Sequence, residues 1–333
     1  YDKQGRVEKL TYSKGSSQMT YDYEYDSNGN LSMVTDNYLG RVTLYKYDSA
    51  GKMTNFIEYD KITLENLSSA WYTYDEQSRL SMVFYDQDYV YNSNNYYNSS
   101  SSLLYTYNEN GSLNKYEIDS DGTVYRIVPN YDGHNRVDSK SISMGSLVNN
   151  ITYEYKTNGT RGSVVISKYT SKMGSGAQKV YNYTYDNANA NITKITDAQG
   201  NILREYIYDT LGRLTRENNQ ASDRTYIYTY DNNGNILSKK IYGYSEGSGT
   251  PSTTLYSTYN YTYGNSNWGD QLTSYRGQTI SYDSVGNPTS YYNGSRMTMT
   301  WTGGNLMSVV NGGQTTSYTY NDSGIRTGKT AGG

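Results

Sequence analysis

The sequence predicts an all-β fold in which repeated antiparallel β-hairpins join into one long coiled sheet. One phrase recurs along the chain: Tyr-Asp, two variable residues, Gly, a basic or polar residue, and an aliphatic residue. Aromatic residues alternate with other residues ahead of each copy. The chain has 32 Gly and only 3 Pro, which favours tight turns and strands that keep their backbone donors. Because strands twist with one hand, a sheet built from one hairpin type is expected to coil.

The alternating aromatic residues predict the strand that enters each turn. Period two places the rings of one run on one face of a strand. The chain has 44 Tyr, against 2 Phe and 3 Trp. Tyrosine suits a sheet that is partly buried and partly exposed to solvent, because its ring packs while its hydroxyl forms a hydrogen bond. The runs lie within residues 21–25, 45–47, 72–74, 105–107, 153–155, 181–185, 206–208, 226–230, 259–263 and 318–320.

The Tyr-Asp-x-x-Gly segment predicts the turn itself. Asp at the first turn position can accept hydrogen bonds from backbone donors two residues further on. Gly supplies the left-handed φ of a type I turn that is followed by a glycine bulge. The aliphatic residue two places after Gly is expected to open the returning strand. The residues predicted to build these structural turns include Tyr25, Asp26, Gly29, Tyr47, Asp48, Gly51, Tyr208, Asp209, Gly212, Tyr230, Asp231 and Gly234.

The spacing of the phrase predicts the domain organisation. Tyr25 to Tyr47 spans 22 residues, and Tyr208 to Tyr230 spans 22, which fits two strands with two turns. Polar stretches at 92–102 and 245–251 are expected to be solvated insertions in hairpin loops. The phrase resumes after each of them, so residues 1–333 are expected to form a single continuous repeat domain. Since the chain begins inside a repeat, it is expected to be a fragment whose export signal lies outside it.

Composition argues against several classes of function. A formal net charge of −3 with no basic stripe makes nucleic acid an unfavourable partner, and no apolar stretch is long enough to span a membrane. The absence of Cys excludes disulfides and thiolate metal sites. The one His, His134, falls in a degenerate turn copy and is expected to be solvated. The recurring Asp occupies one equivalent slot in successive turns, so the turn explains it. No catalytic residue, cofactor site or metal site is predicted, and the chain is expected not to be an enzyme.

The aromatic residues have two interpretations. Cross-strand packing accounts for the regular tyrosine runs. A stacking surface for sugar rings is the other interpretation, with Trp71, Trp268 and Trp301 as its platforms. Trp268 lies in the irregular stretch 264–269, so it is the single best candidate for ligand contact, although it could instead fill the interior of the fold.

On its recurring Tyr-Asp-x-x-Gly-[Arg/Asn]-[Leu/Val] phrase, the chain resembles the YD-repeat, or Rhs, family. That family includes bacterial Rhs and wall-associated proteins, shell components of insecticidal toxin complexes, and the extracellular part of teneurins. Residues 282–288 and 318–330 resemble the final repeats before the family's core, which is missing here together with its self-cleaving acidic residues. Neither self-cleavage nor toxin activity is therefore carried over.

The resemblance implies a structural, encapsulating scaffold: a segment of an exported bacterial shell that encloses or presents a C-terminal toxin. The implied partner is a C-terminal toxin or cargo domain of the same parent protein, and the implied location is extracellular or at the cell surface. The alternative is an extracellular adhesin or carbohydrate-binding surface module, whose partners are cell-surface glycans.

Overall fold

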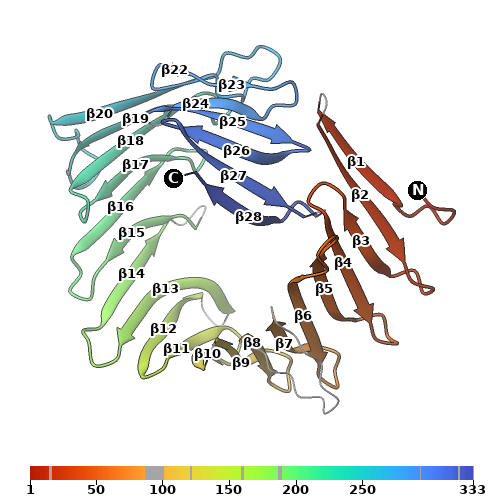
Figure 1. Ribbon diagram of the computed structural model, residues 1–333. Coiled ribbons are helices and arrows are strands. Elements are labelled where there is room, and N and C mark those ends of the chain that lie inside the picture. Colours follow the sequence, from red (N-terminus) through yellow and green to blue (C-terminus); the bar gives the residue numbers. More distant parts are fainter. Residues whose placement is uncertain are drawn as a thin grey trace. The chain divides into compact units, whose positions relative to one another are not determined.

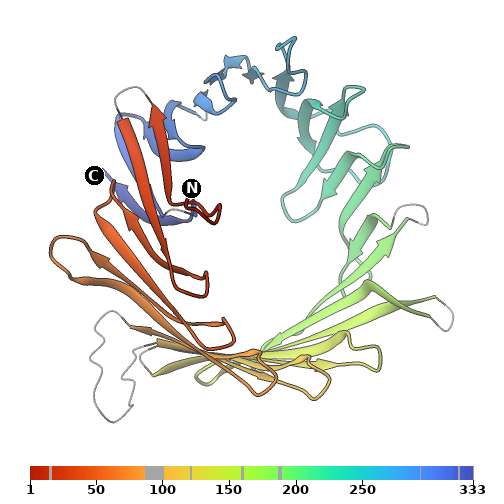
Figure 2. The same cartoon turned by 90° about the vertical axis from the view of Figure 1, so that its right-hand side faces the viewer.

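The computed structural model describes residues 1–14, 17–86, 101–120, 122–158, 161–186, 190–292, 294–321 and 323–332. Regular structure in these ranges is β-strand throughout, and they contain no helix (Figures 1 and 2). The insertion predicted at 92–102 lies outside the described residues up to residue 100. Ser101 and Ser102 already belong to a strand.

The strands follow one another as an antiparallel meander, from red to blue in Figure 1. Their bounds are β1 (Lys9–Lys14), β2 (Ser17–Tyr25), β3 (Leu31–Asp36), β4 (Arg41–Tyr47), β5 (Met53–Asp60), β6 (Asn66–Tyr74), β7 (Leu80–Asp86), β8 (Ser101–Tyr107), β9 (Leu113–Ser120), β10 (Thr123–Tyr131), β11 (Val137–Met144), β12 (Leu147–Asn158), β13 (Arg161–Met173), β14 (Lys179–Tyr185), β15 (Ile192–Thr196), β16 (Ile202–Tyr208), β17 (Leu214–Asn219), β18 (Arg224–Tyr230), β19 (Ile236–Gly243), β20 (Leu255–Thr262), β21 (Ser274–Tyr275), β22 (Gln278–Thr279), β23 (Ser281–Tyr282), β24 (Pro288–Tyr292), β25 (Arg296–Thr302), β26 (Asn305–Asn311), β27 (Gln314–Tyr320) and β28 (Arg326–Ala331).

Strands β1–β22 form a 22-stranded sheet, and β23–β28 form a 6-stranded sheet. The all-β class and the repeated antiparallel hairpins predicted from the sequence are therefore confirmed. The ladder breaks at Ile280, between β22 and β23. Side chains continue across this break: Tyr282 donates its hydroxyl to the Leu272 carbonyl at 2.7 Å, and the rings of Tyr275 and Tyr291 stack with their centroids 5.9 Å apart.

The described chain falls into two compact units. Unit 1 comprises Tyr1–Asn150, Thr302–Met307 and Tyr318–Thr330, and unit 2 comprises Ile151–Trp301, Ser308–Ser317 and Ala331–Gly333. Within unit 1 the buried apolar side chains are Met19, Tyr21, Val34, Val42, Ala70 and Val83, and within unit 2 they are Ile151 and Ile280. Most other strand residues are half-buried on both faces of their strand. Each unit is thus held by its strand ladders and by side chains along them, with little apolar core.

Tyrosines pack against one another across neighbouring strands. Tyr105 on β8 lies opposite Tyr116 on β9, and their ring centroids are 5.1 Å apart. Tyr169 on β13 lies opposite Tyr181 on β14, with centroids 5.9 Å apart. Such aromatic cross-strand pairs stabilise a sheet by roughly 0.2–1 kcal/mol each. The regular tyrosine runs therefore contribute packing, as the first interpretation of them expects.

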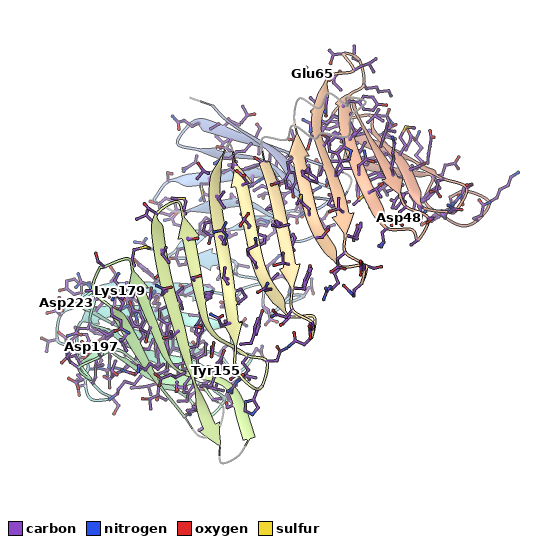
Figure 3. All side chains as sticks on the ribbon, turned by 90° about the horizontal axis from the view of Figure 1, so that it is seen from below. Asp48, Glu65, Tyr155, Lys179, Asp197 and Asp223 are labelled. Atoms are coloured by element: carbon purple, nitrogen blue, oxygen red, sulfur yellow. The ribbon has the colours of Figure 1, made fainter. Side chains whose placement is uncertain are left out.

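Each Tyr-Asp turn contains a bulge. Tyr25 pairs with Leu31 after a register shift at Glu24/Tyr25, and Tyr230 pairs with Ile236 after a shift at Thr229/Tyr230. The glycine of the turn takes positive φ, for example +89° at Gly29. The returning strands open at the aliphatic residue of the phrase, as β3, β5, β9, β17 and β19 do. Figure 3 labels Asp48, in the Tyr-Asp turn between β4 and β5, and Asp197, in a similar turn between β15 and β16 that follows Thr196.

Two degenerate turns keep the same backbone without glycine. Ser78 has a φ of +65° and Asn135 a φ of +59° at the glycine position. A left-handed conformation costs a residue with a Cβ roughly 1–2 kcal/mol, and Asn tolerates it better than Ser. The turn geometry is therefore imposed by the rest of the phrase, and glycine only relieves its strain.

We expect Ser78→Gly to raise the free energy of unfolding by about 0.5–1 kcal/mol, because it removes the left-handed strain while adding some chain entropy to the unfolded state. Asn135→Gly should give a smaller gain. Urea denaturation of both variants checks this, with Gln77→Gly as the control at a neighbouring position that has no positive φ. A loss of stability in Ser78→Gly would contradict the strain argument.

Candidate functional site

The aspartate of each Tyr-Asp turn closes the turn with its side chain. The Oδ1 atom of Asp209 accepts hydrogen bonds from the backbone N–H groups of Leu211 and Arg213, at 3.0 and 2.9 Å. Its Oδ2 atom accepts from the Arg213 Nε at 2.7 Å. In the turn of Asp26, the Asn30 side chain makes the equivalent contact at 3.1 Å. The basic or polar residue after glycine is therefore explained by its bond to the aspartate.

The tyrosine of each turn binds the turn before it. The Tyr47 hydroxyl donates to the Leu31 carbonyl at 2.9 Å, and the Tyr230 hydroxyl donates to the Leu214 carbonyl at 2.7 Å. In both cases the acceptor is the aliphatic residue of the preceding phrase. We call this bond the tyrosine link. It is made by Tyr25, Tyr47, Tyr74, Tyr107, Tyr131, Tyr185, Tyr208, Tyr230, Tyr263, Tyr282 and Tyr320.

One unit uses a different side chain for the same purpose. Trp301 stands where other units have tyrosine, and its indole Nε1 donates to the Pro288 carbonyl at 2.7 Å. Trp301 therefore belongs to the structural series of links. Its role as a sugar platform, one of the two interpretations of the sequence, has no support from this geometry.

A second contact joins successive turns. The residue after glycine lies over the ring of the next tyrosine: Arg213 over Tyr230, with 4.8 Å between the guanidinium carbon and the ring centroid, and Arg79 over Tyr107 at 4.4 Å. Lys52 lies over Tyr74 in the same way. Cation–π contacts of this kind contribute roughly 0.5–1 kcal/mol at exposed sites. Sequence reasoning missed both contacts, although the near absence of Phe is a signal that the hydroxyl is needed.

These contacts keep the turn aspartates ionised and several turn tyrosines protonated at neutral pH. The Arg136 side chain, helped by backbone N–H groups, lowers the pKa of Asp132 to about 2. The Asn30 side chain lowers the pKa of Asp26, and the backbone N–H of Arg213 lowers that of Asp209. Burial raises the pKa of Tyr47 and Tyr230. Because a general acid or base works best with a pKa near the operating pH, these groups are suited to structure and poorly suited to proton transfer.

Acid should therefore weaken the fold. A carboxyl whose pKa is lowered by folding contributes stability above its unfolded pKa and loses it as the pH falls through the folded value. For Asp132 that window runs from 3.8 down to about 2. We expect Asp132→Asn to be less stable than the wild type at pH 7 and to show a shallower loss of stability across this window. Urea denaturation at several pH values measures it, with the exposed Asp223→Asn as control.

His134 lies in the turn of Asp132 and is exposed. Its backbone N–H donates to the Asp132 Oδ1 at 2.8 Å. Among the residues that the structure describes, no three His, Cys, Asp or Glu side chains gather where they could hold a metal ion.

Trp268 borders a concavity of unit 2. The concavity has a volume of about 580 Å³, and its lining includes Asn265, Trp268, Gln271 and Asp283. The indole is 51% exposed and lies over Gly286, where an added Cβ would stand 2.5 Å from its Cζ3 atom. Asn265 donates to Gln271 at 2.7 Å, which fixes two amides beside the ring. An exposed aromatic ring is thus placed beside hydrogen-bonding groups.

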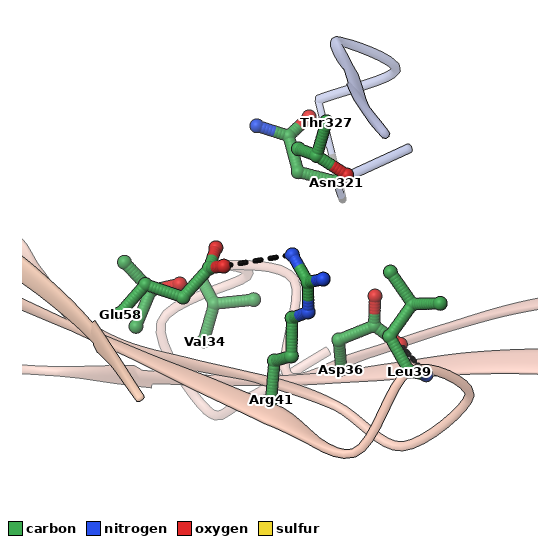
Figure 4. Close-up of a pocket in the computed structure, with 8 residues that line it drawn as sticks. Val34, Asp36, Leu39, Arg41, Glu58, Asn321 and Thr327 are labelled. Atoms are coloured by element: carbon green, nitrogen blue, oxygen red, sulfur yellow. Dashed lines mark hydrogen bonds and ion pairs between the residues drawn. The ribbon is translucent and has the colours of Figure 1, made fainter. Parts of the chain in front are cut away.

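Unit 1 has a much smaller cavity, shown in Figure 4. Arg41 donates from Nη1 to the Glu58 Oε1 at 2.9 Å, and Asn321 and Thr327 face this pair from the β27–β28 hairpin. The volume is about 10 Å³, room for one water molecule at most. This cavity cannot receive a substrate.

Residues 1–148 match the family model described as Teneurin YD-shell. This first part of the chain is similar to the YD-repeat shell of teneurins. The match covers less than half of the chain, but the YD turns and their tyrosine links continue beyond it as far as Tyr320. The matched family is a shell family, which indicates a structural role for these repeats. A comparison with the curated proteins found no match.

Several solved structures are similar to this chain at low identity. The crystal structure of TcdB2-TccC3-TEV is 11% identical, with a TM-score of 0.27, and the likeness covers 96% of this chain and 24% of that one. The Photorhabdus luminescens Tc holotoxin pore is 13% identical, with a TM-score of 0.24, covering 96% and 23%. A porin-like protein from Bacteroides uniformis is 11% identical, with a TM-score of 0.24, covering 70% and 93%. The chain spans about a quarter of the length of the toxin structures. No helix in the described ranges is long and apolar enough to cross a membrane.

Proposed function

We propose that the chain is a structural scaffold, a segment of an exported bacterial YD-repeat shell that encloses or presents a C-terminal toxin or cargo domain of the same protein. In this proposal residues 1–333 act as one continuous repeat domain without catalytic activity, outside the cell or at its surface. The observation that carries the proposal is the series of tyrosine links between Tyr25 and Tyr320, with Trp301 in place of tyrosine in one unit, which tie successive turns together.

The links suit the wall of a compartment. Such a wall has two wetted faces, one toward the solvent and one toward the contents, so it cannot rely on a thick apolar core. Most strand residues of this chain are half-buried on both faces. Stability must then come from ladders and from bonds between neighbouring repeats, as in other repeat arrays. The Asp and Tyr side chains of the turns supply such bonds.

Limited proteolysis tests the proposal. A protease-sensitive reporter domain is placed after residue 333 in the natural full-length protein, and its half-life is compared with that of the free reporter. Protection that disappears when the shell is unfolded with urea is the expected result. A reporter that is digested as fast as the free domain, while the repeats stay folded, would show that the chain does not enclose its cargo.

A second candidate function is binding of cell-surface glycans, and the concavity beside Trp268 favours it. A concave site with one exposed aromatic ring and a few fixed polar groups is what ligand sites present. Trp268→Ala should abolish binding of the chain to a cell-wall polysaccharide while its far-UV spectrum stays unchanged. Tyr38→Ala is the matched control, since Tyr38 is equally exposed, at 51%, and lies outside the concavity. Absence of binding across a broad glycan array would rule this role out.

A further inference from the structure

Strands β16–β18 carry a row of buried polar side chains. Glu205 lies opposite Asn218, and Asn218 lies opposite Thr225, so the three side chains stand side by side on one face. Arg216 is two residues from Asn218 on β17 and shares that face. Asn218 and Thr225 are fully buried, and Arg216 is only 5% exposed. In a sheet whose other residues are mostly half-exposed, these groups must be covered by something specific.

The cover is the chain's own loop between β19 and β20. Residues 245–251 were expected to be solvated, and this expectation is wrong for part of them: Glu246 and Ser248 are exposed, but Ser245 and Gly247 are held against the row. The loop turns back over the sheet because buried donors and acceptors there need partners. We call residues 245–249 the strap.

The row binds the backbone of alternate strap residues. The Ser245 N–H donates to the Thr225 Oγ1 at 3.0 Å. The Gly247 N–H donates to the Glu205 Oε2 at 2.8 Å, and the Gly247 carbonyl accepts from the Asn218 Nδ2 at 2.9 Å. The row therefore recognises main-chain groups together with the Ser245 hydroxyl, and within the described residues it makes no hydrogen bond with the side chains of Glu246 and Ser248.

Arg216, which lies two residues before Asn218 on the same face of β17, also binds the strap. Its Nη2 donates to the Ser245 Oγ at 2.7 Å, and its Nη1 donates to the Gly249 carbonyl. Its Nε donates to the Asn218 Oδ1 at 2.7 Å, which orients that amide. Within the described residues Arg216 makes no ion pair at contact distance, so the strap oxygens and the charge of the nearby Glu205 carboxylate together balance its buried charge. A buried charge that depends on one loop is destabilised whenever the loop lifts.

We propose that this row is a peptide-binding site, occupied in this chain by its own strap and open to a second small-residue segment of the Ser-x-Gly-x-Gly kind when the strap lifts. The contacts to the backbone make the site tolerant of the x residues. The φ of +70° at Gly247 requires glycine, or a residue that accepts a left-handed conformation, at the centre. The inference does not depend on the shell function.

The test uses the whole chain with residues 245–250 deleted, which leaves a short hairpin loop between β19 and β20. The probe is a fluorescent peptide with the sequence of residues 243–251. We expect saturable binding to the deleted chain and binding at least about tenfold weaker to the intact chain, whose strap competes in cis. Arg216→Lys in the deleted chain should also weaken binding by about tenfold or more, because Lys lacks the planar fork. Arg126→Lys is the control, an exposed arginine on β10.

A folded deletion variant that does not bind the peptide, or that binds equally well with Arg216→Lys, would overturn the proposal. If the deletion variant does not fold, hydrogen exchange in the intact chain decides. We expect the amides of Ser245 and Gly247 to exchange faster than the ladder amides of β18, through local lifting of the strap. Arg216→Lys should accelerate both while leaving Gly234, in a Tyr-Asp turn, unchanged. Strap amides that exchange only at the rate of the β18 ladder would mean that the site never opens.

Discussion

Tyr230→Phe is expected to lower the free energy of unfolding by about 1–2 kcal/mol, although it removes a single oxygen atom. The ring stays in place under Arg213, so packing and the cation–π contact survive. What is lost is the hydroxyl that donates to the Leu214 carbonyl at 2.7 Å, which leaves that carbonyl partly buried without this donor. Urea denaturation followed by far-UV circular dichroism measures the change.

Tyr228→Phe is the matched control for this substitution. Tyr228 lies two residues earlier on β18 and makes no hydroxyl hydrogen bond among the described residues. We expect its substitution by Phe to change the stability little. Equal losses in the two variants would mean that the tyrosine link contributes nothing beyond the general effect of removing a hydroxyl.

Alkaline pH should unfold the protein over a narrow range, because all tyrosine links need protonated hydroxyls. Burial raises the pKa of Tyr47, Tyr74 and Tyr208, each of which donates to a backbone carbonyl. A group whose pKa is raised by folding contributes stability below its unfolded pKa of about 10 and loses it as the pH rises through the folded value. The loss is therefore expected to begin above about pH 10.

Two signals recorded together measure this transition. Absorbance at 295 nm reports tyrosine ionisation, and far-UV circular dichroism reports the sheet. We expect them to change together, since ionisation of one linked tyrosine favours loss of its neighbours. Complete ionisation with an unchanged sheet signal would contradict the importance of the links. A variant that carries Phe at Tyr47, Tyr208 and Tyr230 should unfold more gradually with pH.

The sequence predicts the fold class because the turn chemistry is local. The bonds from Asp209 to Leu211 and Arg213 stay within four residues, so a short phrase contains all of their partners. The tyrosine links join residues farther apart, such as Tyr47 and Leu31. Two features of the sequence indicate these links: the regular spacing of the repeated phrase, and the use of Tyr in place of Phe.

The contacts of the strap were beyond sequence reasoning. Gly247 binds Glu205, 42 residues earlier, and Ser245 binds Arg216, 29 residues earlier. Among the residues that the structure describes, these contacts occur once and do not follow the repeat, so no periodicity of the sequence predicts them. Glycine and serine in a loop usually indicate solvation, and here the buried Arg216 overrides that tendency.

The direction of the tyrosine link has a consequence for how such chains lengthen. In the described chain each unit that carries the tyrosine link offers a carbonyl to the next unit and presents a hydroxyl to the one before it. A duplicated unit of this kind would therefore find both hydrogen-bond partners at any junction. An insertion inside the Tyr-Asp-x-x-Gly segment would instead break bonds on both sides of it. Growth of the gene in whole hairpins is thus favoured by the chemistry, and length variants should differ by multiples of one unit.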